Sequence, residues 1–101
     1  MAQPTKVAKV ADIPPGTGRT VEAGGKKIAL FNVAGKFEAM DDTCLHRGGP
    51  LGEGSLEGGV VTCPWHHWTY EAATGKCLTK PGAVLAKYPV TVVGDDVLVE
   101  A

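Results

Sequence analysis

Short runs of β-branched and apolar residues, broken by glycine, fill the first part of the chain. Such runs are typical of β-strands when they span about four to eight residues. The pattern predicts strands at Thr5 to Val10, Arg19 to Ala23, Lys26 to Val33 and Lys36 to Asp41. No segment shows the 3.6-residue period of an amphipathic helix.

Turn signals lie between these runs and near the end of the chain. Gly24-Gly25 and Ala34-Gly35 are short enough for hairpins, and Gly94-Asp95 separates two further runs, Tyr88 to Val93 and Asp96 to Val99. Fixed turns are predicted at Pro14-Pro15-Gly16 and Pro81-Gly82. The fold class is therefore all-β, an antiparallel sandwich or small barrel.

Residues 43–80 differ from this pattern because they are rich in glycine. Two short runs, Val60 to Thr62 and Thr69 to Glu71, are predicted strands, and a turn at Thr74-Gly75 leads into Lys76 to Leu78. We expect one domain, residues 1–101, with residues 43–80 as an inserted subdomain.

Composition restricts the function. A chain of 101 residues is short for an enzyme that must also bind a nicotinamide or a flavin. The net charge of −1 argues against a nucleic-acid partner, and no apolar run is long enough to span a membrane. Three cysteines and an N-terminus without a secretory signal favour the cytoplasm.

Charge is unevenly distributed along the chain. From Asp41 to Glu71 there are five acids and one base, Arg47, whereas the remainder carries six acids and nine bases. The acidic segment either steers a basic partner toward the site or is a solvated loop face.

Two motifs carry the chemistry. Cys44-Leu45-His46 and Cys63-Pro64-Trp65-His66 are separated by sixteen residues, and each offers one thiolate and one imidazole. An even split between two loops suits an iron pair with sulfur ligands on one metal and nitrogen ligands on the other. Structural zinc fits less well, because its cysteines usually share one arm or outnumber the histidines.

This spacing and the flanking residues resemble the Rieske iron–sulfur family over essentially the whole chain. The resemblance implies one [2Fe–2S] cluster, with Cys44 and Cys63 on one iron and His46 and His66 on the other. Gly49 and Trp65 stand where members of quinol-oxidising membrane complexes have two further cysteines. The chain is therefore similar to the soluble, disulfide-free ferredoxins of the family.

The resemblance also implies the cluster's electronic setting. Two ferric ions, two sulfides, two thiolates and neutral imidazoles sum to zero charge, which raises the reduction potential to roughly −150 to +300 mV. Trp68 replaces a serine of high-potential relatives, so we expect the lower part of that range, although Tyr70 matches a second hydrogen-bond donor. The outer ring nitrogens of the histidines should couple the potential to pH under alkaline conditions.

Other residues receive expected roles. The segment from Lys80 to Ala83 is the candidate for the family's proline-containing loop over the cluster. Four apolar residues are expected to form a docking rim at the electron exit, and the alternative for the two tryptophans is a cover of the cluster against water: Leu45, Pro50, Trp65 and Trp68. Cys77 is expected to be a small buried hydrophobe on a strand, and His67, where the family usually has glycine, a surface residue.

We expect a Rieske-type ferredoxin, a monomer in isolation, that carries single electrons from a flavin-dependent reductase to the terminal oxygenase of an aromatic-ring dioxygenase. It would catalyse no reaction itself. The alternative is the small subunit of a cytoplasmic NAD(P)H nitrite reductase. An oxygenase fragment is disfavoured, because catalytic mononuclear iron needs two more histidines and a carboxylate, and only His67 remains.

Overall fold

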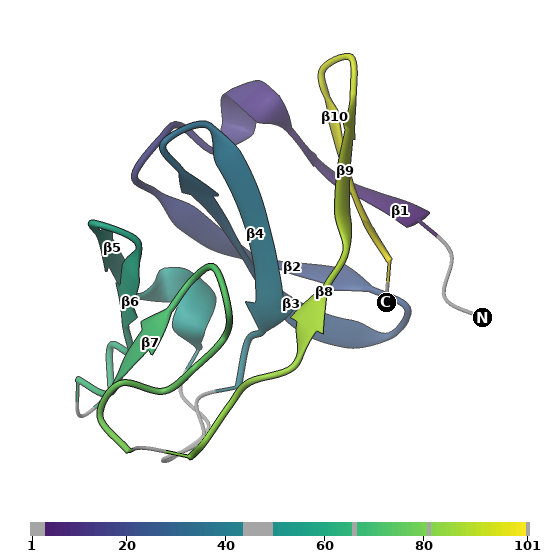
Figure 1. Cartoon of the computed structure of the whole chain (residues 1–101). Helices are drawn as coiled ribbons and strands as arrows, with labels where there is room; N and C mark the ends of the chain where they lie inside the picture. The colour runs from purple at the N-terminus through teal and green to yellow at the C-terminus, as the bar shows by residue number, and fades with distance from the viewer. Residues whose placement is uncertain (1–3, 44–49, 66, 81, 101) are drawn as a thin grey trace.

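The computed structural model describes residues 4–43, 50–65, 67–80 and 82–100. Over these residues the regular structure consists of strands and two short 3₁₀ turns, which confirms the all-β class (Figure 1). The elements are β1 (Pro4–Lys9), η1 (Val10–Asp12), β2 (Gly18–Ala23), β3 (Lys26–Val33), β4 (Lys36–Asp41), η2 (Leu51–Glu53), β5 (Ser55–Glu57), β6 (Val60–Thr62), β7 (Thr69–Glu71), β8 (Lys87–Tyr88), β9 (Val90–Val93) and β10 (Asp96–Glu100).

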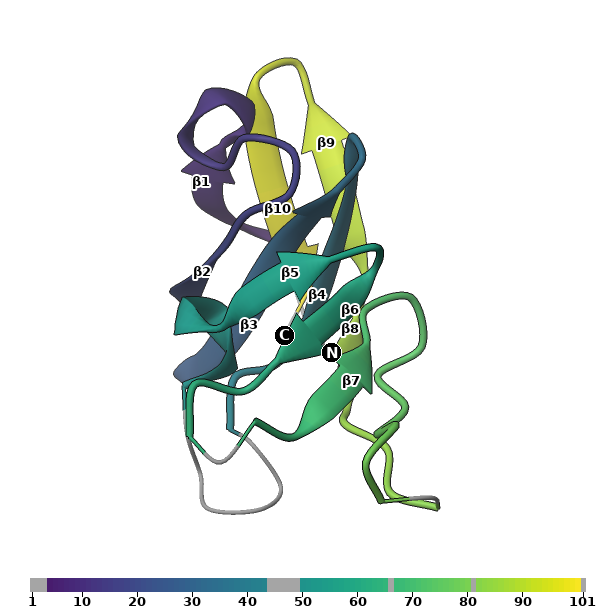
Figure 2. The same ribbon diagram turned by 90° about the vertical axis from the view of Figure 1, so that its left-hand side faces the viewer.

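The strands form three antiparallel sheets. Their orders are β1-β10-β9, β2-β3-β4-β8 and β5-β6-β7. The first two sheets make up the base of the molecule, and the third lies beside the β2-β3-β4-β8 sheet (Figures 1 and 2). Within the described residues no sheet closes on itself, so the base is a sandwich rather than a barrel.

The middle strand of the base, β3, explains how the layers are held together. Residues Ile28 to Phe31 are all fully buried, because successive side chains point to opposite faces and both faces are covered. Ile28 and Leu30 belong to a core shared with Val97 of β10. The other face supplies the core under the third sheet, with these buried residues: Ala29, Phe31, Met40, Leu51, Val61, Cys63, Tyr70, Ala72, Cys77 and Leu85.

The predicted hairpins at Gly24-Gly25 and Ala34-Gly35 are confirmed. All four residues have positive φ, between 53° and 97°, as two-residue turns that match the strand twist require. Ala34, at φ 53°, adopts this conformation without being glycine. The register pairs Val21 of β2 with Ile28 and Ala39 of β4 with Leu30, and all four residues belong to the core shared with β10.

Two sequence expectations were wrong in detail, and one strand was missed. The first strand ends at Lys9, and Val10 begins a 3₁₀ turn instead. The run from Tyr88 to Val93 is two strands, because Pro89 offers no N–H for the ladder: β8 pairs with β4, and β9 pairs with β10. Strand β5, Ser55–Glu57, was not predicted, since its side chains alternate too weakly.

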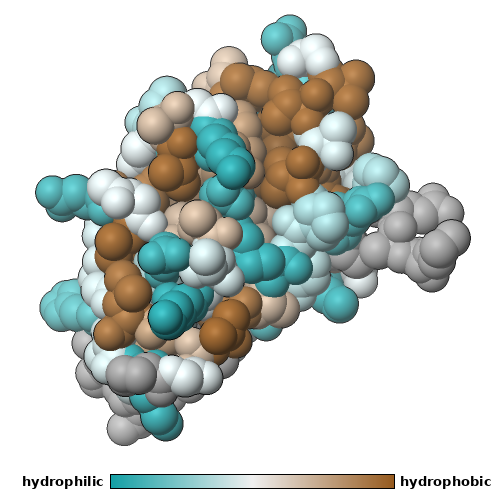
Figure 3. All heavy atoms as spheres, viewed as in Figure 1, coloured by the Kyte–Doolittle hydropathy of each residue, from teal (hydrophilic) through white to brown (hydrophobic). Residues whose placement is uncertain are grey.

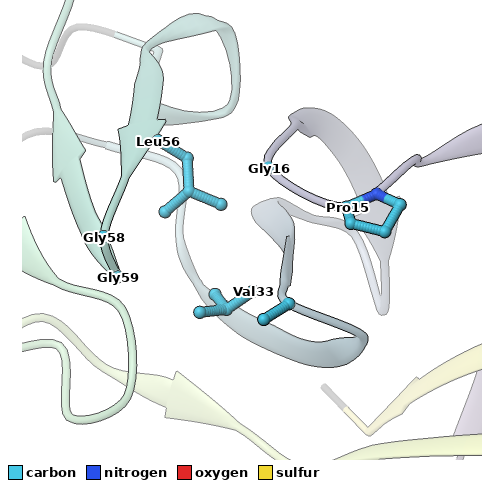
Figure 4. Close-up of a pocket in the computed structure, with 7 residues that line it drawn as sticks. Pro15, Gly16, Val33, Leu56, Gly58 and Gly59 are labelled. Carbon is cyan, nitrogen blue, oxygen red and sulfur yellow. The ribbon is translucent and has the colours of Figure 1, made fainter.

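Two surface features lie away from the loop that begins at Cys63. Apolar side chains gather around the β9–β10 hairpin, where Val92 and Val93 are exposed (Figure 3). An apolar cleft of about 460 Å³ lies beside the β5–β6 turn, with Val33 and Leu56 facing each other and Pro15 closing one side (Figure 4). Among the described residues, no helix is long and apolar enough to cross a membrane.

Candidate metal centre

The second motif lies on a hairpin loop between β6 and β7. Strand register pairs Thr62 with Thr69, and the Cys63 amide then donates to the Trp68 carbonyl at 2.7 Å, which closes the base of the loop. The Cys63 side chain is completely buried. The Trp65 amide donates to Cys63 Sγ at 3.4 Å. A buried sulfur with an amide donor is the setting of a thiolate ligand, whose charge the amide stabilises.

His67 shows why glycine suits its position. Its φ is +60°, in the left-handed region where residues with a Cβ are disfavoured. Histidine is among the non-glycine residues found there more often than average. Its side chain is exposed, which confirms the surface position expected for it.

The first motif lies on the connection from β4 to η2, and its two ends are fastened by Asp42. Thr43 and Pro50 form an isolated β-bridge, and the Leu51 amide donates to the Asp42 carbonyl at 2.8 Å. Asp42 Oδ1 accepts from the Gly52 amide at 2.8 Å and from the Thr20 hydroxyl at 2.9 Å. Asp42 is only 4% exposed, so this carboxylate is part of the loop's support and not of an acidic surface.

A third segment lies along the free side of β7. Cys77 forms an isolated backbone β-bridge with Tyr70, and the Leu78 amide donates to the Thr69 carbonyl at 2.8 Å. The Thr79 hydroxyl oxygen accepts from the Thr69 amide and lies 3.0 Å from the Thr69 hydroxyl oxygen. Cys77 is 1% exposed, as predicted, but it sits in isolated bridges and not in a regular strand. Its Sγ accepts from the Lys80 amide at 3.3 Å, which shapes the turn that follows.

Lys87 joins the third sheet to the base. From β8, its Nζ donates to Glu38 Oε1 at 2.8 Å and to the Ala72 carbonyl at 2.7 Å. Next to it on β8, burial and then the Asp41 carboxylate raise the pKa of the Tyr88 hydroxyl above its ordinary value. Tyr88 packs against the core shared with β10.

The structure separates the two tryptophans that the sequence treated together. Trp65 is half exposed, whereas Trp68 is partly buried and packs against the core that contains Cys63. Trp68 therefore covers the interior, and Trp65 presents apolar surface beside the buried thiol. Pro50 is partly buried, and Leu45 lies outside the described residues. Leu78, 46% exposed, adds apolar surface that the sequence did not indicate.

Cys44, His46 and His66 lie outside the described residues, so Cys63 is the one predicted ligand that the structure describes. In the part of the chain that the structure describes, no three Cys, His, Asp or Glu side chains gather as a metal site. The described parts fit an iron–sulfur cluster: a buried thiol with an amide donor, and fastened ends on both motif-bearing loops. Tyr70 is fully buried in the same core as Cys63, and its bond to a ligand cysteine stays a prediction.

Sequence reasoning missed the residues that support the loops. Asp42, Lys87 and Thr79 are ordinary polar residues outside both motifs, and no local spacing marks them. Gly52 is similar: a Cβ there would collide with the Thr20 backbone, which the sequence alone does not reveal.

Comparison with known proteins identifies the family to which this fold and site belong. The fold and the site define a small all-β protein with a buried thiol at the base of a loop that carries a Cys/His motif. The model of the Rieske [2Fe-2S] domain matches residues 3–89. This chain belongs to that family, whose members carry one [2Fe–2S] cluster.

The relatives sharpen this assignment. The biphenyl dioxygenase ferredoxin subunit of Pseudomonas sp. (strain KKS102) is 40% identical over 98 residues, covering 95% of this chain and 90% of the relative. A chain from the solved complex of reduced oxygenase and oxidized ferredoxin in carbazole 1,9a-dioxygenase is 34% identical, with a TM-score of 0.87 and coverage of 96% and 92%.

A third comparison concerns the alternative function. A solved structure named for an NADH-dependent nitrite reductase small subunit of Mycobacterium tuberculosis has a TM-score of 0.89 at 23% identity, covering 100% of this chain and 96% of that one. At this identity the likeness shows the fold alone.

Proposed function

We propose that this protein is a Rieske-type ferredoxin that carries one electron at a time from a reductase to the terminal oxygenase of a ring-hydroxylating dioxygenase. The single observation that carries the proposal is the buried Cys63 thiol with its amide donor at the base of the second motif's loop. The ferredoxin relatives support it at 34% and 40% identity over nearly the whole chain.

In this proposal Cys44 and Cys63 bind one iron, and His46 and His66 bind the other. The cluster supplies a one-electron redox couple when bound. The chain's own residues provide the rest: Cys63 is held out of water, the Trp65 amide stabilises its sulfur, and hydrogen bonds fasten the described ends of both loops. Residues 43–80 act as the cluster-binding subdomain of a single domain, residues 1–101.

The proposed partners are a flavin-dependent ferredoxin reductase and a terminal oxygenase, and the proposed location is the cytoplasm. Trp65 offers apolar surface next to the buried thiol, where a partner can approach the redox centre without crossing the body of the protein. The relatives serve biphenyl and carbazole dioxygenases at similar identity, so likeness alone does not select the aromatic substrate. The nitrite reductase alternative is less supported, because its likeness is confined to the fold and this chain keeps all four candidate ligands.

Two measurements test the proposal. The dithionite-reduced protein should give the EPR signal of a mixed-ligand [2Fe–2S] centre, and it should transfer electrons between a dioxygenase reductase and its oxygenase. Replacing His46 with cysteine should lower the potential, because a thiolate adds negative charge to the oxidised cluster. An unchanged potential in His46→Cys refutes the ligand assignment, and a cluster that no dioxygenase component reduces or oxidises refutes the pathway.

A further inference from the structure

A side-chain clasp ties the second motif's loop to the segment that runs on from Cys77. Thr69, the first residue of β7, comes three positions after the candidate ligand His66. Its amide donates to Thr79 Oγ1 at 2.9 Å, and the two hydroxyl oxygens are 3.0 Å apart, within hydrogen-bond distance. The clasp thus joins residues that are ten positions apart, the first in strand β7 and the second in a segment outside the regular strands.

The clasp continues a ladder that the backbone does not complete. The Glu71 amide bonds the Lys76 carbonyl at 2.8 Å, and the Leu78 amide bonds the Thr69 carbonyl at 2.8 Å. At the next step the Thr79 side chain, in place of a backbone carbonyl, accepts from the Thr69 amide. A hydroxyl is therefore needed at position 79, and serine would supply it whereas valine would not.

The segment after Thr79 is folded back on itself. The Cys77 amide bonds the Ala83 carbonyl at 2.9 Å, and the Ala83 amide bonds the Lys80 carbonyl at 3.3 Å. Ala83 packs against the core that contains Cys63. The described parts of the β6–β7 connection and of the stretch that leads into β8 lie at the same end of the molecule in both views (Figures 1 and 2). The Thr79 clasp fixes where this second segment leaves the sheet.

We propose that Thr79 is a positioning residue: through Thr69, its hydroxyl holds residues 78–80 beside the β7 end of the second motif's loop and limits the access of water to the redox centre. This inference rests on the proposed function, because the centre it protects is the [2Fe–2S] cluster. Thr79, an exposed surface residue, would then help to set the reduction potential and the lifetime of the cluster.

The direction of the effect follows from charge. The oxidised cluster with two thiolates is neutral and the reduced one carries a net −1, so water stabilises the reduced form more. Removing the Thr79 hydroxyl should therefore raise the reduction potential. It should also speed the loss of the cluster in air on the order of fivefold, which corresponds to about one net hydrogen bond.

The experiment compares three cluster-loaded variants with the unmodified protein. Thr79→Val removes the clasp with almost no change in volume, and Thr79→Ser keeps it. Thr74→Val is the matched control: the Thr74 hydroxyl also makes two local bonds, to Glu71 Oε1 at 2.9 Å and from the Lys76 amide at 3.2 Å, but at the opposite end of β7. The readouts are the potential from a spectroelectrochemical titration, the decay of visible absorbance in air, and hydrogen exchange of the Thr69 amide.

Only Thr79→Val should raise the potential, shorten the cluster's lifetime and speed exchange at Thr69, and Thr79→Ser should restore all three. Equal potentials in Thr79→Val and the unmodified protein overturn the proposal, as does an equal shift in Thr74→Val. If Thr79→Val does not fold, Thr69→Val, which keeps the amide bond to Thr79, should show a smaller shift in the same direction, and no shift overturns the proposal. If the unmodified protein binds no cluster, the proposed function fails, while the Thr69 exchange rate still tests the clasp.

Discussion

The support of the first motif's loop by Asp42 can be tested by removing its carboxylate. In Asp42→Ala, the buried Gly52 amide and the Thr20 hydroxyl both lose their acceptor, from distances of 2.8 Å and 2.9 Å. A buried donor left without a partner costs about 1–3 kcal/mol, and the lost bond to Thr20 adds about 0.5–1.5 kcal/mol. We expect a loss of about 2–4 kcal/mol, a large share of the roughly 5–15 kcal/mol that such domains have.

Asp42→Asn is the matched variant, because its amide oxygen can replace Oδ1 in both bonds at a cost of about 1 kcal/mol. Thr20→Val removes one of the two bonds and should cost about as much as the asparagine variant. An exposed aspartate, Asp12, which accepts from the Lys9 amide at 3.1 Å, provides the control for removing a carboxylate elsewhere.

The assay is urea unfolding of the cluster-loaded proteins followed by circular dichroism, together with iron and sulfide content after purification. Because Asp42 holds both ends of the first loop, the alanine variant should also retain less iron than Asp42→Asn or Asp12→Ala. If the alanine and asparagine variants are equally stable and equally loaded, the acceptor role of Oδ1 is wrong. If Asp12→Ala loses as much iron as Asp42→Ala, the effect belongs to charge and not to the loop.

Two further predictions concern the same end of the molecule. Lys87→Met should lower the free energy of unfolding in urea by about 1–3 kcal/mol, because the Ala72 carbonyl and the Glu38 carboxylate lose the Lys87 ammonium as donor. Lys36→Met is the control: the exposed Lys36 ammonium lies 3.6 Å from Glu38, and its loss should change the free energy of unfolding by less than about 0.5 kcal/mol. Equal effects of the two variants would remove the special role of Lys87. His67→Val should cost about 1–2 kcal/mol at φ +60°, while His67→Asn should be within about 0.5 kcal/mol of the unmodified protein, and a harmless valine would show that the backbone there is not left-handed.

The sequence predicted the parts of the fold whose cause is local. Short turns that contain glycine predicted the hairpins, and the apolar runs predicted the strands of the base, because turn geometry and side-chain alternation act within a few residues. It failed at Pro89, where the run from Tyr88 to Val93 changes sheets, since the pairing partner of each half lies about fifty residues away or beyond the next turn. The proline was visible, but its consequence depends on which sheet each half can reach.

At the site, too, the local motifs could be predicted, whereas the residues that support them from a distance could not. The motifs state which atoms can bind iron, and their spacing predicts four ligands. Of these the structure describes Cys63, whose side chain is buried, and the full ligand set stays a prediction. The supports come from outside the motifs: a strand-end carboxylate for the first loop, and a threonine clasp for the segment beside the second. Each support joins segments at least ten residues apart, so no local pattern could reveal it.

Ligands and supporting residues would affect the reduction potential of the cluster in different ways. The ligand set fixes the broad range, because it determines the charge of the cluster. The position within that range depends on water access and on amide bonds to sulfur, such as that of Trp65 to Cys63. Both depend on how firmly the loops are held, and the holding residues lie outside the motifs. Two family members with identical motifs can therefore differ in potential through residues such as Thr79 and Asp42, which makes these positions, and not the ligands, the place to look for adaptation to a particular reductase and oxygenase.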